Sequence, residues 1–159
     1  MENELSSSAR RVQEILKASG KNYVVVELPE STRTAKEAAQ TIGCEVGQIV
    51  KSIVFMASMT RRGILVIASG INRINETSIS SIIEEPIVKA DSDFVRNVTG
   101  YAIGGVPPVG HFSSVIILID EDLMQYEKVW AAAGTPHAVF SLSPIDLPEL
   151  TRGKVINIH

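Results

Sequence analysis

Apolar and polar residues follow two different spacings along this chain, and each spacing predicts a type of secondary structure. Apolar residues at helical spacing, with a capping side chain before them and glycine or proline after them, predict helices. Short runs rich in β-branched residues predict strands. The predicted helices cover residues 6–20, 34–43, 75–83, 91–100 and 120–134, with further turns at 45–49 and 143–150. The predicted strands cover residues 23–28, 50–57, 64–68, 87–90, 115–119, 138–142 and 155–158.

The order of these elements predicts the class of fold. Strands 50–57 and 64–68 are separated by a short turn at 61–63, so we expect them to form a hairpin, in which strands pair antiparallel. Helices alternate with the remaining strands. We therefore expect an α/β (α+β) fold with a mixed, mostly antiparallel central sheet and flanking helices.

Two segments carry more specific expectations. The run 23–28 is so rich in β-branched residues that we expect it to be a buried strand. Asp120 is expected to cap a helix that ends at Gly134. That helix would carry four large side chains on one face, namely Leu123, Tyr126, Val129 and Trp130.

Length, charge and cysteine content limit the classes of protein. With 159 residues, the chain is expected to form a single domain over 1–159. Its formal net charge of −3 argues against nonspecific, charge-driven binding of nucleic acid, but leaves room for a small basic patch that holds one RNA end. Cys44 is the only cysteine, which fits a reducing compartment, and no apolar run reaches the roughly 18 residues that span a bilayer. We expect a cytoplasmic protein with no membrane or DNA partner.

The most unusual segment is an uncharged run of glycine and proline from Gly100 to His111. Glycine has no Cβ, so the backbone can adopt uncommon angles there or approach a ligand closely. Pro107 and Pro108 stiffen the run and remove two backbone donors. Such a loop suits a site where main-chain N–H groups contact the substrate, but it equally fits a tight connection at the surface.

Lys51 is the second unusual feature, because it lies inside an apolar strand. Alternation places it on the same face as Ile49, Ile53 and Phe55. A lysine is almost never fully buried without a partner. Lys51 therefore either extends its ammonium into solvent at the sheet margin or points into a polar pocket.

Common catalytic motifs are missing from the sequence. The three histidines, His111, His137 and His159, are far apart and have no cysteine partners at metal-binding spacing. There is no Gly-x-Ser-x-Gly nucleophile motif, and the glycines of 100–110 match neither a dinucleotide fingerprint nor a phosphate loop. We therefore expect no metal and no cofactor.

Three segments follow one another along the chain and read VKSIVF at 50–55, GYAIGGVPPVG at 100–110 and AGTPHA at 133–138. Together they resemble the YbaK/prolyl-tRNA synthetase editing-domain family. The resemblance extends from the first predicted helix to residues 151–155. It implies a freestanding or inserted domain that hydrolyses the ester between a wrong amino acid and its tRNA.

The resemblance also implies roles for individual residues. Lys51 would hold the terminal nucleotide of the tRNA, and the backbone of 104–108 would face the aminoacyl carbonyl. The substrate's own 2′-hydroxyl would help to position the water, which explains the lack of a side-chain base. Many family members carry serine where Pro107 stands, so serine-dependent selectivity is in doubt here. The implied catalytic residues are Lys51, Gly104, Gly105 and Val106; the implied substrate contacts are Lys51, Tyr101, Ile103, Pro107, Pro108, Gly110, His111, Gly134 and His137.

Three functional hypotheses follow from these observations. The first is a trans-editing deacylase for mischarged tRNA, of the proline type, that removes a small wrong amino acid such as alanine, cysteine or serine. Its partners would be the acceptor end of the tRNA and a prolyl-tRNA synthetase or an elongation factor. The second is a binding module without catalysis in a synthetase complex, and the third is hydrolysis of an unrelated small ester.

Overall fold

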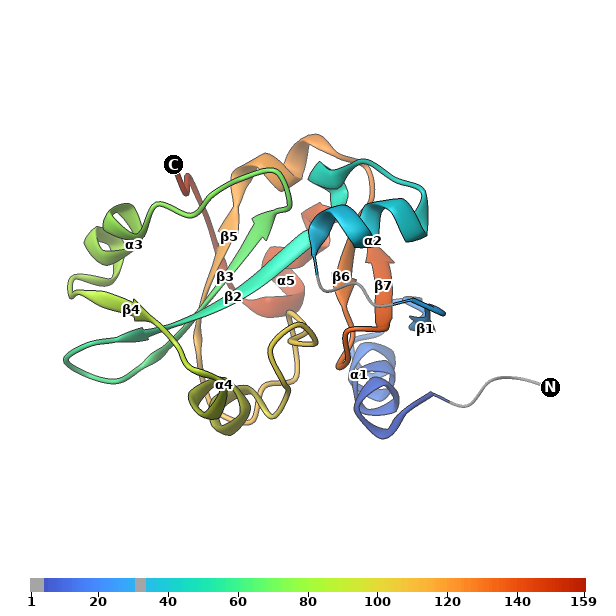
Figure 1. The fold of residues 1–159 in the computed structure, drawn as a ribbon, viewed down its shortest axis with the longest axis horizontal. Coiled ribbons are helices and arrows are strands. Elements are labelled where there is room, and N and C mark those ends of the chain that lie inside the picture. The colour runs from blue at the N-terminus through green and yellow to red at the C-terminus, as the bar shows by residue number, and fades with distance from the viewer. Residues whose placement is uncertain (1–4, 31–33) are drawn as a thin grey trace.

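Two β-sheets and five α-helices form the fold in residues 5–30 and 34–159, which the computed structural model describes (Figure 1). The larger sheet consists, in spatial order, of β4 (Ile87–Lys89), β2 (Val50–Ala57), β3 (Gly63–Ser69), β5 (Ile116–Asp120) and β8 (Lys154–Ile156). The smaller sheet consists of β1 (Val26–Glu27), β7 (Ala138–Leu142) and β6 (Val129–Ala132). The α-helices are α1 (Ser7–Ala18), α2 (Ala35–Ile42), α3 (Glu76–Ile83), α4 (Ser92–Thr99) and α5 (Leu147–Thr151). Short 3₁₀ helices lie at η1 (Val46–Gln48), η2 (Glu121–Gln125) and η3 (Pro144–Asp146).

Helix ends lie where the capping residues of the sequence predict them. The Thr34 hydroxyl accepts a hydrogen bond from the Glu37 N–H at the start of α2. The Asp91 carboxylate does the same for α4, where the bond from the Phe94 N–H measures 2.8 Å. Gly100 ends α4 at a φ of 86°, in the left-handed region that favours glycine. Local capping therefore fixes both ends of the helix that leads into the glycine-proline loop.

Pairing in the sheets confirms the mixed, mostly antiparallel arrangement. Strand β2 forms the predicted hairpin with β3, from Val50 opposite Ser69 to Met56 opposite Gly63. β4 and the smaller sheet are also antiparallel, whereas β3, β5 and β8 run parallel to one another. The strands form two sheets rather than one central sheet. An isolated bridge between Ile49 and Trp130 links the two sheets where they meet.

Apolar clusters cover both faces of the larger sheet. Leu65 and Ile67 of β3 belong to the cluster that α1 and the smaller sheet complete, while Ile64 and Val66 belong to the cluster on the opposite face. All four are fully buried, and burying such a side chain contributes about 1.5–3 kcal/mol. In Figure 1, α1 packs beside the smaller sheet and α3 lies at the far end of the larger one. The hairpin β2–β3 is thus a rigid base for the residues that it carries.

The prediction of a buried strand at 23–28 is wrong. Only β1 (Val26–Glu27) is a strand, and it is the edge of the smaller sheet. Val24 and Val26 are exposed, whereas Val25 is buried and Tyr23 packs partly buried against the core. An edge strand has one side in solvent, so a run of valines can be half exposed despite its high strand propensity.

The prediction of one helix over 120–134 is also wrong. Asp120 caps a helix as expected, but this is the short 3₁₀ helix η2, and the chain then extends into β6. β6 pairs antiparallel with β7, with Val129 opposite Leu142. Val129 and Ala131 alternate inward, which is the pattern of a strand. Pairing in the β6–β7 hairpin overrides the helical spacing of the apolar residues.

No helix within the described part of the chain is long and apolar enough to cross a membrane.

Candidate active site

A cavity of about 480 Å³ lies where the two sheets meet. Strand β2 lines one wall with Lys51, the smaller sheet contributes Trp130, and helix α2 closes another side. The glycine-proline loop adds Ile103, Gly104 and Val106. The volume is in the range of small-molecule sites, roughly 300–1,000 Å³. The fold thus brings the two unusual features of the sequence, the lysine and the loop, to one cavity.

The Lys51 side chain is half-buried, and its ammonium is held by the protein. It donates a hydrogen bond to the main-chain carbonyl of Asn72, in the segment that follows β3. Desolvation lowers the pKa of Lys51, the nearby charge of Asp120 raises it, and Arg73 lowers it. Since an ammonium has three N–H donors, two remain for a ligand in the cavity. Lys51 is thus half-buried near the start of β2, where it lines a largely apolar cavity and contacts the Asn72 carbonyl.

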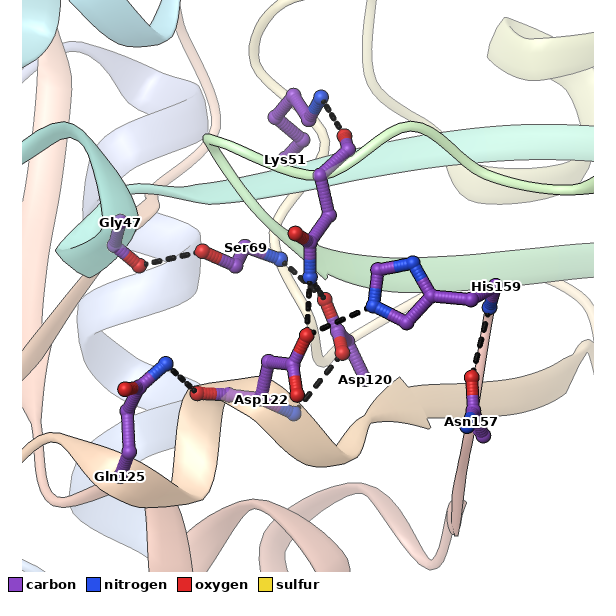
Figure 2. A network of polar contacts seen from close by, with 9 residues as sticks. Gly47, Lys51, Ser69, Asp120, Asp122, Gln125, Asn157 and His159 are labelled. Atoms are coloured by element: carbon purple, nitrogen blue, oxygen red, sulfur yellow. Dashed lines mark hydrogen bonds and ion pairs between the residues drawn. The ribbon is translucent and has the colours of Figure 1, made fainter.

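A polar network fixes the segment that holds Lys51 (Figure 2). The Asn72 side-chain amide donates to the Asp120 carboxylate at 2.8 Å and to the Asp122 carboxylate at 2.7 Å. The other contacts of Asp120 come from the N–H groups of Ser69 and Asp122, both at 2.9 Å. Asp120 is fully buried at the end of β5. The network therefore anchors Asn72, the partner of Lys51, to the interior of the larger sheet.

Two residues of the glycine-proline loop line the cavity and have N–H groups without a protein acceptor among the described residues. The Gly105 N–H donates to the Ala102 carbonyl at 3.0 Å within a tight turn, so it is not available to a ligand. Gly104, at a φ of 91°, and Val106 both line the cavity. Among the described residues, no protein acceptor takes a hydrogen bond from either N–H. The predicted set of three donors is therefore reduced to Gly104 and Val106.

Gly105 and Gly134 have a packing role. The Gly134 N–H donates to the Gly105 carbonyl at 2.9 Å, which joins the loop to the turn between β6 and β7. A Cβ on Gly105 would lie 2.8 Å from the Gly134 backbone, and one on Gly134 would lie 2.7 Å from the Ser8 carbonyl oxygen. Gly134 does not line the cavity with Lys51. These glycines let three backbone segments pack closely.

Several of the predicted substrate contacts lie elsewhere. Pro108, Gly110 and His111 line a separate cavity of about 350 Å³ beside α1 and α5. The His111 Nε2 lies 2.7 Å from the Pro107 carbonyl oxygen, so it is the donor, and burial lowers the pKa of His111. Pro107 is buried and lines neither cavity. None of these four residues therefore lines the cavity with Lys51.

Tyr101 and His137 also lie outside the cavity that Lys51 lines. Tyr101 is only 2% exposed and packs in the core, because the turn after α4 directs its ring inward. His137 is exposed, and its main-chain carbonyl accepts a hydrogen bond from the Leu28 N–H that extends the β1–β7 pairing. Of the residues expected to contact the substrate, Lys51 and Ile103 line this cavity, and Ile103 is exposed.

Sequence reasoning missed other residues of the site. Trp130 forms a half-buried aromatic wall, but its helical spacing assigned it to a helix face. Lys36 of α2 is a second lysine at the cavity. Asn72 lies in a segment without any motif, and Asp120 was interpreted as a helix cap alone. Only the pairing of β3 with β5 brings these two residues beneath Lys51.

The cavity is thus lined by a lysine and by loop residues whose N–H groups have no acceptor among the described residues. Within residues 5–30 and 34–159, no group of three or more histidine, cysteine, aspartate or glutamate side chains could hold a metal ion. The chain belongs to the aminoacyl-tRNA editing domain family, whose model matches residues 29–150.

Comparison with individual proteins agrees with this family. A solved structure described as "a putative trans-editing enzyme for prolyl tRNA synthetase" shares 49% sequence identity and a TM-score of 0.92, with 98% of each chain covered. The uncharacterized protein YwhH of Bacillus subtilis is 29% identical over 82% of this chain and 83% of its own length. The "Putative Cys-tRNA(Pro)/Cys-tRNA(Cys) deacylase EbsC" of Enterococcus faecalis is 25% identical over 96% of this chain and 92% of its own.

A proline–tRNA ligase is also among the relatives. The enzyme of Limosilactobacillus fermentum is 32% identical over 57% of this chain, but the match spans only 16% of the ligase. The similarity is therefore to one segment of that enzyme.

Proposed function

We propose that the protein is a freestanding, single-domain aminoacyl-tRNA deacylase that hydrolyses the ester of a mischarged tRNA. The observation that carries the proposal is that one cavity is lined by Lys51 and by Gly104 and Val106 of the glycine-proline loop. A cation at one wall suits a nucleotide phosphate, and backbone donors at another suit an ester carbonyl. Membership of the editing-domain family supports the same reaction.

The substrate we propose is tRNA(Pro) that carries a small wrong amino acid. The support is the description of the 49% identical structure as an editing enzyme for prolyl tRNA synthetase, together with the name of EbsC. Apolar walls from Val50, Ala131 and Val139 suit a short side chain such as that of alanine or cysteine. The acidic net charge predicts that a synthetase or an elongation factor helps to deliver the tRNA.

In the proposed reaction, water adds to the ester carbonyl carbon and the bond to the ribose oxygen breaks. Negative charge develops on the carbonyl oxygen, where the Gly104 and Val106 N–H groups would stabilise it. The loss of one such donor typically costs about 2.7–4 kcal/mol of barrier lowering. The ribose oxygen leaves with a proton, and the neighbouring 2′-hydroxyl of the substrate orients the attacking water. Lys51 positions the nucleotide, so the ester lies at the loop.

A panel of charged tRNAs tests the proposal. Purified protein would be incubated with tRNA(Pro) carrying alanine, cysteine, serine or proline, and the remaining ester would be quantified over time. We expect hydrolysis of at least one small wrong amino acid well above the rate without protein, and slower loss of proline. Tight binding of the tRNA without any turnover across the panel would instead identify a binding module and reject the deacylase.

The packing of Gly105 predicts that Gly105→Ala lowers both stability and deacylation. The new methyl group would meet backbone atoms of the 134–135 turn at 2.8 Å, and such overpacking costs about 1–3 kcal/mol. Because this turn holds the loop, the donors at Gly104 and Val106 would move as well. Chemical denaturation and single-turnover hydrolysis of the panel substrate would measure the two effects.

Gly20→Ala is the matched control for this prediction. Gly20 has a φ of 82°, and no atom lies within 4 Å of the place that a methyl group would take, so alanine adds only backbone strain far from the loop. It should lose stability and keep its hydrolysis rate. If Gly105→Ala keeps both the wild-type stability and the wild-type rate, the close packing of 105 on 134 has no role in holding the loop.

A further inference from the structure

Asp120 is joined to Lys51 by a continuous set of contacts. The Lys51 ammonium donates to the Asn72 carbonyl, and the Asn72 side-chain amide donates to the Asp120 carboxylate at 2.8 Å. Figure 2 shows Lys51 and Asp120 at opposite ends of this connection. Asp120 is fully buried, so its carboxylate has no contact with bulk water. One residue, Asn72, therefore separates a half-buried ammonium from a buried carboxylate.

Helix capping explains only part of this arrangement. A cap needs one carboxylate oxygen, and Oδ1 of Asp120 fills that role by accepting from the Asp122 N–H. Oδ2 instead accepts from the Ser69 N–H and from Asn72, which both lie outside η2. A serine or asparagine would cap the helix without burying a charge. Capping therefore does not explain why Oδ2 of Asp120 contacts Asn72 or why a charged residue is buried at this position.

We propose that Asp120 is a positioning residue for Lys51: acting through Asn72, its buried carboxylate holds the ammonium at the cavity wall. The inference rests on the proposed function, because a neutral or displaced lysine would not bind a nucleotide phosphate. The charge of Asp120 acts on the ammonium across Asn72, and a nearby opposite charge favours the charged form of a lysine. Asp120 is accordingly the charge that raises the pKa of Lys51 against the effect of burial.

Other charged groups near Lys51 act differently. Arg73 lowers the pKa of Lys51, and Lys36 lines the same cavity from α2. Asp122 also accepts from Asn72, but its side chain is 36% exposed and it pairs with His159 at 2.9 Å. The hydrogen bond from His159 lowers the pKa of Asp122, and this contact raises the pKa of His159. Among these charged residues near Lys51, Asp120 is thus the fully buried carboxylate.

The test is the titration of Lys51 itself in Asp120→Asn. The lysine ε-carbons would be followed by NMR across alkaline pH, with the Lys51 signal assigned by its loss in Lys51→Arg. Removing the negative charge favours the neutral amine, so the Lys51 midpoint is expected to move to lower pH. The alkaline limb of kcat/KM on the panel substrate should move in the same direction, because the phosphate then loses its cation at lower pH.

Glu121→Gln is the control for loss of charge. Glu121 is the next residue, but it is exposed, so water screens its charge and the Lys51 midpoint should stay in place. Asn72→Ala is the second variant, for use if Asp120→Asn does not fold. It leaves the bonds of Asp120 to Ser69 and Asp122 intact. It is expected to raise KM more than it lowers kcat, since it frees the segment that holds Lys51.

Two results would overturn the inference. An unchanged Lys51 midpoint in a folded Asp120→Asn protein would leave Asp120 as a helix cap only. An unchanged KM in Asn72→Ala would remove the positioning role. The NMR titration needs no tRNA, so it is independent of the proposed function. A wild-type protein that hydrolyses no mischarged tRNA would reject the deacylase and leave the Lys51 titration to be judged separately.

Discussion

Replacement of Lys51 by alanine is expected to lower kcat/KM for hydrolysis of mischarged tRNA by about 10- to 100-fold. A hydrogen bond to a charged group contributes about 1.5–3 kcal/mol, and each 1.36 kcal/mol is a factor of ten. The fold should survive, because the side chain is half-buried and its partner, the Asn72 carbonyl, lies beside the cavity. Single-turnover rates at several enzyme concentrations would separate the loss of binding from the loss of chemistry.

Lys89→Ala is the control for Lys51→Ala. Lys89 lies on the neighbouring strand β4, where it is exposed and opposite Phe55 of β2. Its removal changes the net charge equally but does not touch the cavity, so the rate should stay near that of the wild type. Equal rates for Lys51→Ala and the wild type on every mischarged tRNA would show that Lys51 has no part in the reaction.

The second large effect is expected from Val106→Pro, which removes one backbone donor from the cavity. Loss of a donor to a developing oxyanion typically lowers kcat by about 10²–10³-fold. Val106 is buried, and its N–H makes no bond to the protein within the described residues, so proline removes no existing hydrogen bond. We expect kcat to fall while KM changes little, since the contact would strengthen as charge develops.

Val106→Ala separates the donor from the side chain. It keeps the N–H and loses two methyl groups, so it should lose stability and keep most of kcat. Both variants would be compared below their unfolding temperatures. If Val106→Pro turns over as fast as Val106→Ala, the backbone of this loop does not stabilise the transition state.

Local signals in the sequence predicted much of the fold. Caps such as Thr34 and Asp91, and the turn between β2 and β3, act over a few residues, so they could be identified without knowledge of the rest of the chain. The strand β6 and the edge position of β1 depend on pairing with β7, which is distant from β1 in the sequence. Spacing alone could not predict such pairing, and there the predictions were wrong.

The lining of the cavity was also predicted in part, because local signals are visible in the sequence and long-range packing is not. The sequence shows a lysine within an apolar strand and a loop rich in glycine and proline. Residues of both line the cavity. How the loop folds is decided by packing. Its turn uses the Gly105 N–H, and its C-terminal part turns toward α1, which takes His111 into another cavity. The Asp120–Asn72 contact depends on the parallel pairing of β3 with β5 and has no sequence signal.

The central claim is that Lys51 and the loop donors bind one aminoacylated adenosine in the same cavity. Binding of a stable amide analogue, 3′-alanylamino-3′-deoxyadenosine 5′-phosphate, would test it most directly by NMR. We predict that the analogue shifts the Gly104 and Val106 amide signals and the Lys51 ε-carbon together, with one dissociation constant, and leaves the His111 ring unchanged. Saturable shifts at His111 and Gly110 without any change at Lys51 would contradict the claim.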